Sequence, residues 1–328
     1  MPRSRQTKIG IGVLVAASAL VLLLGPTFLD LYWMRVVSFA MMFAALSTGL
    51  NITAGYTGYP AFGDVVWFGL GSYVTAVLMV RAHWPFEAAL PCSAVACTLV
   101  AALIGPAFLR LRGHYFAIGT LGLNEATRAV VQNVHFTGGA AGLSLPITTG
   151  SVESTARFFY YLFFGAMALA VLLTFSITRS RIGYALRAIR VGEDAATSLG
   201  VNATALKTLA WTMSAGVIGL VGGIYAYWIS YIEPPAVFDV GISIKMFVVM
   251  LLGGVGTLFG PVIGAFALQL LETEVWGNVL NYHLIILGGV VIGLVVLLPG
   301  GILSFARRRL GEVAVLIGRP MAAPGPPR

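Results

Sequence analysis

The sequence RSRIGYALRAIRVGEDAATSLGVNATALKT occupies residues 179–208, and it is the one long charged interval between hydrophobic runs. Apolar or small residues recur in it at steps of three and four, the spacing of one helix face. That stripe consists of Ile182, Ala185, Leu186, Ile189, Ala196 and Leu199. Charged residues such as Arg187, Arg190 and Glu193 mostly lie off the stripe. The interval therefore predicts an amphipathic helix that docks on a partner.

The rest of the chain has the composition of a multi-pass membrane protein. Of its 328 residues, 58% are hydrophobic and 10% are charged, whereas about a quarter of an average soluble domain is charged. A helix needs about 20 apolar residues to cross the hydrocarbon layer. The candidate runs are 9–29, 34–54, 60–80, 86–109, 114–133, 157–178, 209–231, 243–271 and 282–303.

The first of these runs has two interpretations. Arg3, Arg5 and Lys8 precede it, as in a secretory signal. Signal sequences, however, have an apolar region of roughly 7–15 residues and a small-residue cleavage site. The run 9–29 is longer and shows no such site. We therefore expect a retained first span, with a cleaved signal as the alternative.

Basic residues predict the orientation of the chain, because Lys and Arg concentrate in cytoplasmic loops. With the N-terminus inside, Arg110, Arg112 and the interval 179–208 fall on the cytoplasmic side. If every run crossed once, the cluster Arg307–Arg309 would lie outside. One further crossing is needed to bring this cluster inside.

The run 243–271 offers that crossing, because it is long and the stretch GGVGTLFGP at 253–261 interrupts it. Glycine and proline end helices, and irregular backbone at membrane depth is tolerated where protein buries it. Two helices joined by a cytoplasmic turn give about ten passes with both termini in the cytoplasm. We expect one transmembrane domain, 1–312, and a disordered cytoplasmic tail, 313–328.

The sequence contains no pattern typical of catalysis or metal binding. It lacks a Gly-x-x-x-x-Gly-Lys-Ser/Thr phosphate loop, a His-Glu-x-x-His pair and a Gly-x-Ser-x-Gly elbow. Cys92 and Cys97 have the spacing of neither a zinc site nor a redox motif. We expect no enzyme activity, metal or cofactor in this chain, so another chain must hydrolyse any ATP that drives it. The net charge of +8 reflects basic cytoplasmic loops and does not predict nucleic-acid binding.

Ionisable residues within the runs are candidates for a solute pathway, because charge in a membrane is costly. Glu125 and Arg128 stand three apart on one helix and can pair. This pair either fixes helix packing or takes part in passage. Asp64, near the start of its run, either points to the cytoplasmic interface, forms a gate or contacts the solute.

Glycine-rich stretches have similarly open interpretations. The sequence GYTGYPAFGD at 55–64 is either an interfacial turn or a broken helix that presents backbone groups to a solute. Gly256, Gly260 and Gly264 recur every four residues, a spacing typical of close helix packing.

These segments together resemble the permease subunits of ABC importers for branched-chain amino acids, in particular the second of the two paired permeases. The resemblance covers most of residues 35–303. Its motifs are the 55–73 stretch, LRLRGHYFAIGTLG at 109–122 leading to Glu125 and Arg128, TGGAAGL at 137–143, Asp194-Ala195-Ala196-x-x-x-Gly200 and the turn at 252–264.

The resemblance implies an all-helical type II importer fold in the bacterial plasma membrane. Two permeases would form the path, two cytoplasmic ATPases would drive it, and an external binding protein would deliver the substrate. The helix at about 183–200 would then sit in a groove on an ATPase. The implied coupling residues are Gly183, Arg187, Ala188, Arg190, Gly192, Glu193, Asp194, Ala195, Ala196 and Gly200. The implied path or gate residues are Tyr56, Gly58, Phe62, Asp64, Phe68, Tyr73, Asn124, Glu125 and Arg128.

Two departures from the family pattern bear on the substrate. Asp64 stands where relatives usually carry histidine, and Tyr59-Pro60 replaces a more common pair. Branched-chain amino acids are the expected substrates, with urea, short amides or other small polar solutes as alternatives. A secondary carrier or channel would belong to a different class and has no use for a docking helix. A membrane enzyme is the other alternative, but no nucleophile, base or metal cluster converges in the sequence.

Overall fold

The computed structural model describes residues 21–146, 150–278, 288, 289 and 301. Several sequence predictions lie outside these residues. They are residues 9–20 of the first run, nearly all of the run 282–303, the cluster Arg307–Arg309 and the tail 313–328.

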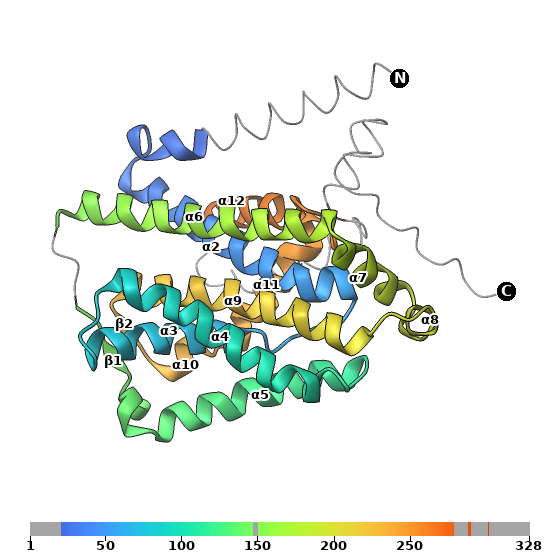
Figure 1. Cartoon of the computed structure of the whole chain (residues 1–328). Coiled ribbons are helices and arrows are strands. Elements are labelled where there is room, and N and C mark those ends of the chain that lie inside the picture. Colours follow the sequence, from blue (N-terminus) through green and yellow to red (C-terminus); the bar gives the residue numbers. More distant parts are fainter. Residues whose placement is uncertain (1–20, 147–149, 279–287, 290–300, 302–328) are drawn as a thin grey trace, which may run out of the picture.

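The described chain is almost entirely helical (Figure 1). The long helices are α2 (Leu31–Leu50), which continues as the π-helix η2 (Asn51–Gly55), α3 (Val65–Val80), α4 (Phe86–Phe108), α5 (His114–Asn133), α6 (Val152–Arg179), α9 (Ala203–Ile229), α11 (Val240–Gly253) and α12 (Gly260–Asn278). The short elements are η1 (Gly25–Thr27), η3 (His135–Thr137), η4 (Gly139–Ala141), α7 (Arg181–Val191), α8 (Glu193–Ser198), α10 (Pro234–Val237) and the paired strands β1 (Leu143–Ser144) and β2 (Tyr231–Ile232).

Helices suited to crossing a membrane dominate the part of the chain that the structure describes. There, 5 helical segments are long and apolar enough to cross, and α3 is a shorter apolar helix. The predicted multi-pass helical bundle is confirmed. The 5 segments are Leu31–Gly55, Phe86–Phe108, Val152–Arg179, Ala203–Ile229 and Pro234–Gly253.

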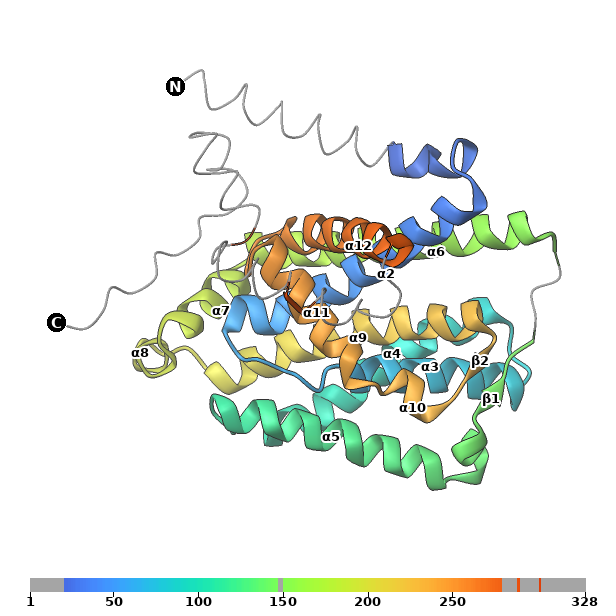
Figure 2. The ribbon, with the colours of Figure 1, turned by 180° about the vertical axis from the view of Figure 1, so that it is seen from behind.

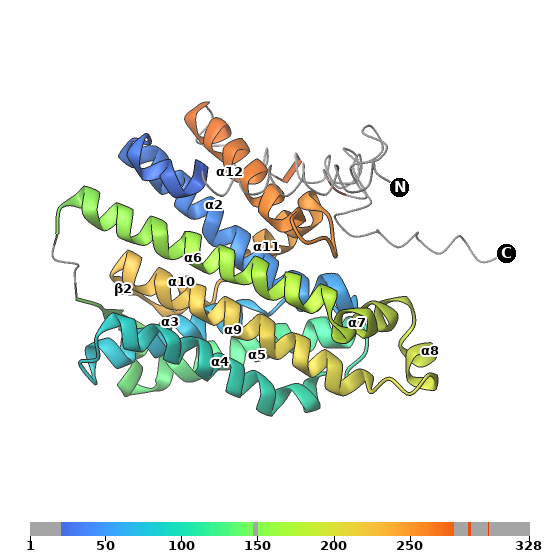
Figure 3. The same ribbon diagram turned by 45° about the horizontal axis from the view of Figure 1, so that its top comes forward.

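Helix α9 lies at the centre of the bundle and packs against α3, α4 and α2. Its residues Trp211, Ile218 and Val221 are fully buried. Figure 3 shows α2 and α12 on one side of α9 and α6, and α4 and α5 on the other. Helix α5 lies at the edge of the bundle, where only one of its faces is covered.

Glycines allow α3 and α9 to approach at backbone distance. A Cβ added to Gly71 would lie 2.1 Å from the carbonyl oxygen of Gly219, and one on Gly222 would lie 2.1 Å from that of Phe68. The Ser72 hydroxyl donates a hydrogen bond of 2.9 Å to the carbonyl of Gly222. Small residues at a helix interface permit this packing within a membrane.

The run 243–271 is broken as predicted. Helix α11 ends at Gly253 and α12 begins at Gly260. The intervening turn lies at the same end of the bundle as α7 and α8, since Gly256 and Arg190 of α7 both approach Gly55. The strands β1 and β2 lie at the opposite end (Figures 1 and 2).

The prediction of a single helix in the charged interval is wrong. Residues 179–208 form α7, α8 and the first turns of α9. The chain turns at Gly192, which has extended backbone angles (φ −173°, ψ 110°) and is the N-cap of α8. Glycine has a low helix propensity, so a break here costs little.

We predict that Gly71→Ala destabilises the bundle by about 1–3 kcal/mol, because the added methyl group overpacks α3 against α9. Thermal unfolding in detergent measures the effect. Gly165→Ala is the matched control, since a Cβ on this α6 glycine meets nothing within 4 Å. Equal melting temperatures for the two variants would contradict the close α3–α9 contact.

Candidate coupling and gate site

Helix α7 has one buried and one exposed face. Gly183, Leu186 and Ile189 are buried, and the last two belong to the predicted apolar stripe. The Ser180 hydroxyl caps the helix by accepting a hydrogen bond from the amide of Gly183 at 3.4 Å. Gly183 also lies against the end of α6, where a Cβ would lie 2.3 Å from the carbonyl oxygen of Ile177.

Large apolar side chains on the outer side of α7 and α8 remain uncovered. Tyr184 is 68% exposed, Val191 is 67% exposed and Leu199 is 85% exposed. Leu199 therefore does not join the buried stripe to which its spacing assigned it. Asp194 and Ala195 are exposed on the same segment. We call Tyr184, Val191, Asp194, Ala195 and Leu199 the outer surface.

The spacing Asp194-Ala195-Ala196-x-x-x-Gly200 has a local structural reason. Ala196 is buried and anchors α8. Gly200 has φ +87°, a left-handed conformation that glycine adopts without steric cost. Its amide donates to the carbonyl of Thr197 at 2.9 Å, and the Val201 amide donates to that of Ala196 at 3.1 Å. The motif thus defines a short helix and its end.

Glu193 points inward, although the sequence placed it among ATPase contacts. Its Oε1 lies 2.8 Å from Nζ of Lys207 on α9, and its Oε2 accepts a hydrogen bond from the Tyr59 hydroxyl. The Lys207 ammonium also lies 4.0 Å from the centre of the Tyr59 ring. Burial raises the pKa of Glu193, but hydrogen bonds from Lys207 and Tyr59 outweigh it and hold the pKa below its ordinary value. The carboxylate therefore stays ionised at neutral pH.

Arg190 is exposed as a residue, but its guanidinium donates a hydrogen bond to the carbonyl of Gly55 at the end of η2. Burial lowers the pKa of this guanidinium. On the same α7 helix, Arg187 lies over the Tyr56 ring at 5.6 Å, and Ala188 is partly buried. Gly58, with φ +78°, leaves room for the Arg190 side chain.

The turn between α11 and α12 joins the same cluster. The Asn51 side chain donates to the carbonyl of Thr257 at 2.9 Å and accepts from the amide of Gly256 at 2.8 Å. Gly256 thus lies in the turn between two helices, and a Cβ on it would lie 3.0 Å from the carbonyl oxygen of Gly55 in η2. Gly260 and Gly264 do lie at close range to α11, where a Cβ on Gly264 would be 2.2 Å from the carbonyl oxygen of Val249.

Asp64 lies in the packed interior. It is fully buried, and its Oδ1 accepts a hydrogen bond of 2.7 Å from the indole N–H of Trp211. Phe68 and Tyr73 are also buried in the bundle, whereas Phe62 is partly exposed and stacks on Phe247. Packing therefore accounts for the positions of Asp64, Phe68 and Tyr73.

The predicted residues of α5 differ in their burial. Asn124 is buried and donates to the carbonyl of Phe238 at 2.9 Å. Glu125 and Arg128 pair at 3.4 Å on the uncovered side, with 55% and 34% of their side chains exposed. Both side chains of the pair are therefore partly open to the surroundings of the described bundle.

Some functional candidates escaped the sequence analysis. Lys245, within a run counted as apolar, pairs with Glu272 at 2.6 Å and lies 4.2 Å from the centre of the Phe43 ring. The sequence could have pointed to Lys245, because a charge within an apolar run is costly unless it has a partner. No local sequence pattern predicts the roles of Tyr59 and Lys207, because only the fold brings each of them into contact with Glu193.

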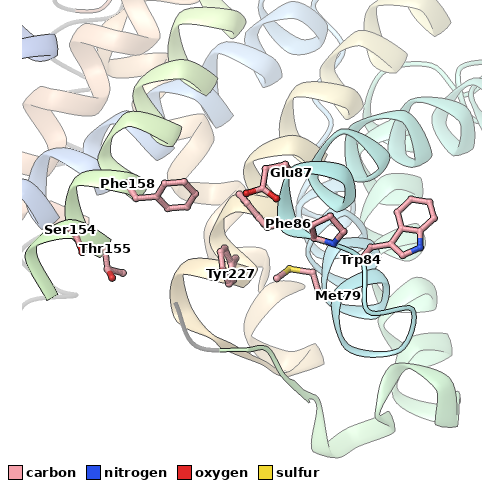
Figure 4. A pocket seen from close by; sticks show the side chains of 9 residues that line it. Met79, Trp84, Phe86, Glu87, Ser154, Thr155, Phe158 and Tyr227 are labelled. Carbon is pink, nitrogen blue, oxygen red and sulfur yellow. The ribbon is translucent and has the colours of Figure 1, made fainter. Parts of the chain in front are cut away.

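A cleft of about 440 Å³ opens at the opposite end, near β1 and β2 (Figure 4). It lies between the start of α4, with Trp84, Phe86 and Glu87, and the start of α6, with Phe158. None of the predicted path residues lines it. Among the described residues, no three His, Cys, Asp or Glu side chains gather to hold a metal ion.

A multi-pass helical bundle with two short helices at one end fits a membrane transport permease, and comparison with known families identifies the class. A family model described as the permease component of branched-chain amino acid transport systems matches residues 32–295. The chain therefore belongs to this permease family of ABC importers.

Curated relatives agree with this assignment. The chain is 29% identical to the LivM permease of the high-affinity branched-chain amino acid system of Salmonella typhimurium, over 84% of the chain and 71% of the relative. It is 28% identical to LivM of Escherichia coli over the same shares. It is 24% identical to LsrC, the autoinducer 2 import permease of Salmonella paratyphi B, over 81% of each chain. No solved structure matches the chain significantly. The protein is thus a multi-pass protein of the bacterial inner membrane.

We predict that Asp64→Leu destabilises the protein by about 1–3 kcal/mol, because it leaves the buried Trp211 N–H without an acceptor. Asp64→Asn, which keeps an oxygen at that position, should retain wild-type stability and solute uptake. Thermal unfolding and uptake by cells check both variants. If a stable Asp64→Asn protein lost uptake, the charge of Asp64 would instead have a role in the passage of the solute.

Proposed function

We propose that this chain and a paired permease form the path through which an ATP-driven importer admits branched-chain or related amino acids. Separate cytoplasmic ATPases supply the energy, and an external binding protein delivers the solute. The observation that carries the proposal is the outer surface of α7 and α8. The chain itself hydrolyses nothing and binds no cofactor.

The outer surface has the chemistry of a docking site. Tyr184, Val191 and Leu199 expose apolar groups on a segment outside the long apolar helices. Apolar groups grouped in this way typically mark a protein interface. Asp194, which pairs with the exposed Arg112 at 3.2 Å, forms part of a polar rim. A groove on an ATPase would cover the apolar groups and leave the rim in water.

The uncovered face of α5 is the proposed wall of the path. Lipid contact is costly for the half-exposed pair of Glu125 and Arg128. The paired permease or water in the path would remove that cost. The gate comprises the segment 56–64, with Tyr56, Gly58 and Phe62. Asp64, Phe68, Tyr73 and Asn124 influence the path through helix packing.

The proposed topology has about ten passes and cytoplasmic termini, because basic loops favour the cytoplasmic side. Arg112, Arg190 and Lys207 meet at one end of the described bundle, which supports that orientation. We assign residues 1–312 to one transmembrane domain and 313–328 to a tail.

The names of the relatives support amino acids as the substrate class, because LivM serves branched-chain amino acid transport. The LsrC relatives import a different solute, autoinducer 2. Urea and short amides are the alternative substrates. The replacement of histidine by Asp64 argues little against amino acids, since Asp64 contacts Trp211 within the bundle.

We predict that Val191→Glu or Leu199→Glu prevents co-purification with the ATPases, because each puts a charge into an apolar interface. The loss of affinity should reach about 2–4 kcal/mol. Val152→Glu is the matched control, since Val152 is 72% exposed at the opposite end. Co-purification of both outer-surface variants at wild-type yield would contradict the docking assignment.

The pair on α5 gives a second test of the path. We predict that Glu125→Arg combined with Arg128→Glu inserts normally but does not restore uptake, because each charge has its own place along the path. Uptake of radiolabelled leucine, with membrane insertion as the control, measures this. Full recovery in the swapped protein, when each single reversal is inactive, would show that only the pairing matters.

A further inference from the structure

Tyr59, Glu193 and Lys207 form a polar cluster between the gate segment, α8 and α9, and we call it the Tyr59 node. We propose that the node is the linkage through which movement of α8 displaces the segment 56–64. The proposal rests on the proposed function, in which an ATPase moves α7 and α8. Glu193 is then a positioning residue for transport and does not contact the ATPase.

The node holds α8 strongly on its inner side. Lys207 is 1% exposed and Glu193 is 17% exposed, so solvent screens their 2.8 Å ion pair little. Both oxygens of Glu193 are engaged, one by Lys207 and the other by the Tyr59 hydroxyl. Hydrogen bonds to a carboxylate are about twice as strong as neutral ones.

The position of Glu193 couples its contact with Tyr59 to any movement of α8. Glu193 is the first residue of α8, a helix of 6 residues flanked by Gly192 and Gly200. A short helix between two glycines can turn as a unit, and Glu193 must move with it. The Tyr59 hydroxyl follows Glu193 because breaking the contact would leave this hydroxyl and the Oε2 of Glu193 without their hydrogen bond.

A second contact holds the other end of the same segment. Arg190 of α7 donates to the carbonyl of Gly55, the last residue of η2. The chain from Gly55 to Tyr59 is therefore attached to α7 at one end and to α8 at the other. The neighbouring Asp194 has no such role, since its partner Arg112 is exposed.

Hydrogen–deuterium exchange on the complete transporter tests the linkage. The complex of this chain, the paired permease and the ATPases is compared with and without ATP and vanadate. In the wild type, exchange should change both in the peptide covering α7 and α8 and in the peptide covering 56–64. In Tyr59→Phe, and in Glu193→Leu combined with Lys207→Met, which removes the carboxylate without leaving the buried ammonium unpaired, the α7–α8 change should persist and the 56–64 change should be lost. Glu153→Gln, which disrupts the exposed ion pair of Glu153 with Arg157 at the opposite end of the bundle, is the matched control and should behave as wild type.

Three results would overturn the proposal, and they have different meanings. A wild-type change at 56–64 in both node variants would show that the node transmits nothing. Loss of both changes in a variant would show that the node only holds α8 in place. An unchanged α7–α8 peptide in the wild type would contradict the docking of the ATPase, and with it the proposed function.

Discussion

The end of this permease that carries α7 and α8 depends on the ion pair between Lys207 and Glu193. An ammonium that is 1% exposed is strongly destabilising without a counterion. Glu193 supplies that counterion from α8, and its second oxygen binds Tyr59. One buried cation therefore fixes the position of α8 relative to both α9 and the gate segment. This ion pair also explains why the Glu193 side chain points into the bundle, although Glu193 directly precedes the motif Asp194-Ala195-Ala196-x-x-x-Gly200.

Two further contacts extend this arrangement across the end of the bundle. Arg190 binds the carbonyl of Gly55, and Asn51 binds the backbone of Gly256 and Thr257. Three segments far apart in the sequence thus meet through hydrogen bonds to backbone groups. Within the bundle, by contrast, close glycine contacts such as that of Gly71 with Gly219 hold the helices together. The segment that carries the outer surface is therefore linked to several helices at once.

The sequence predicted features that depend on local pattern. Helical spacing identified Leu186, Ile189 and Ala196 as buried, and the glycine-rich stretch at 253–261 predicted the break between α11 and α12. The spacing failed at Leu199, because the chain turns at Gly192 and ends α8 at Gly200. Periodicity assumes one continuous helix and cannot follow such a turn.

The sequence could not predict contacts between distant residues. Tyr59 and Glu193 are 134 residues apart, and Asp64 and Trp211 are 147 apart. A polar residue in a motif indicates that a partner exists, but only the fold determines which one. Glu193 and Arg190 were consequently assigned to the ATPase, whereas the structure pairs them with the permease itself.

Photo-crosslinking from position 199 most directly tests the central claim that α7 and α8 receive the ATPase. A photoreactive amino acid replaces Leu199 in cells that express the complete transporter, and Val152, exposed at the opposite end, serves as the control site. The account predicts an adduct between this chain and the ATPase from position 199 and none from position 152. An ATPase adduct from position 152 alone, or from neither position, would contradict it.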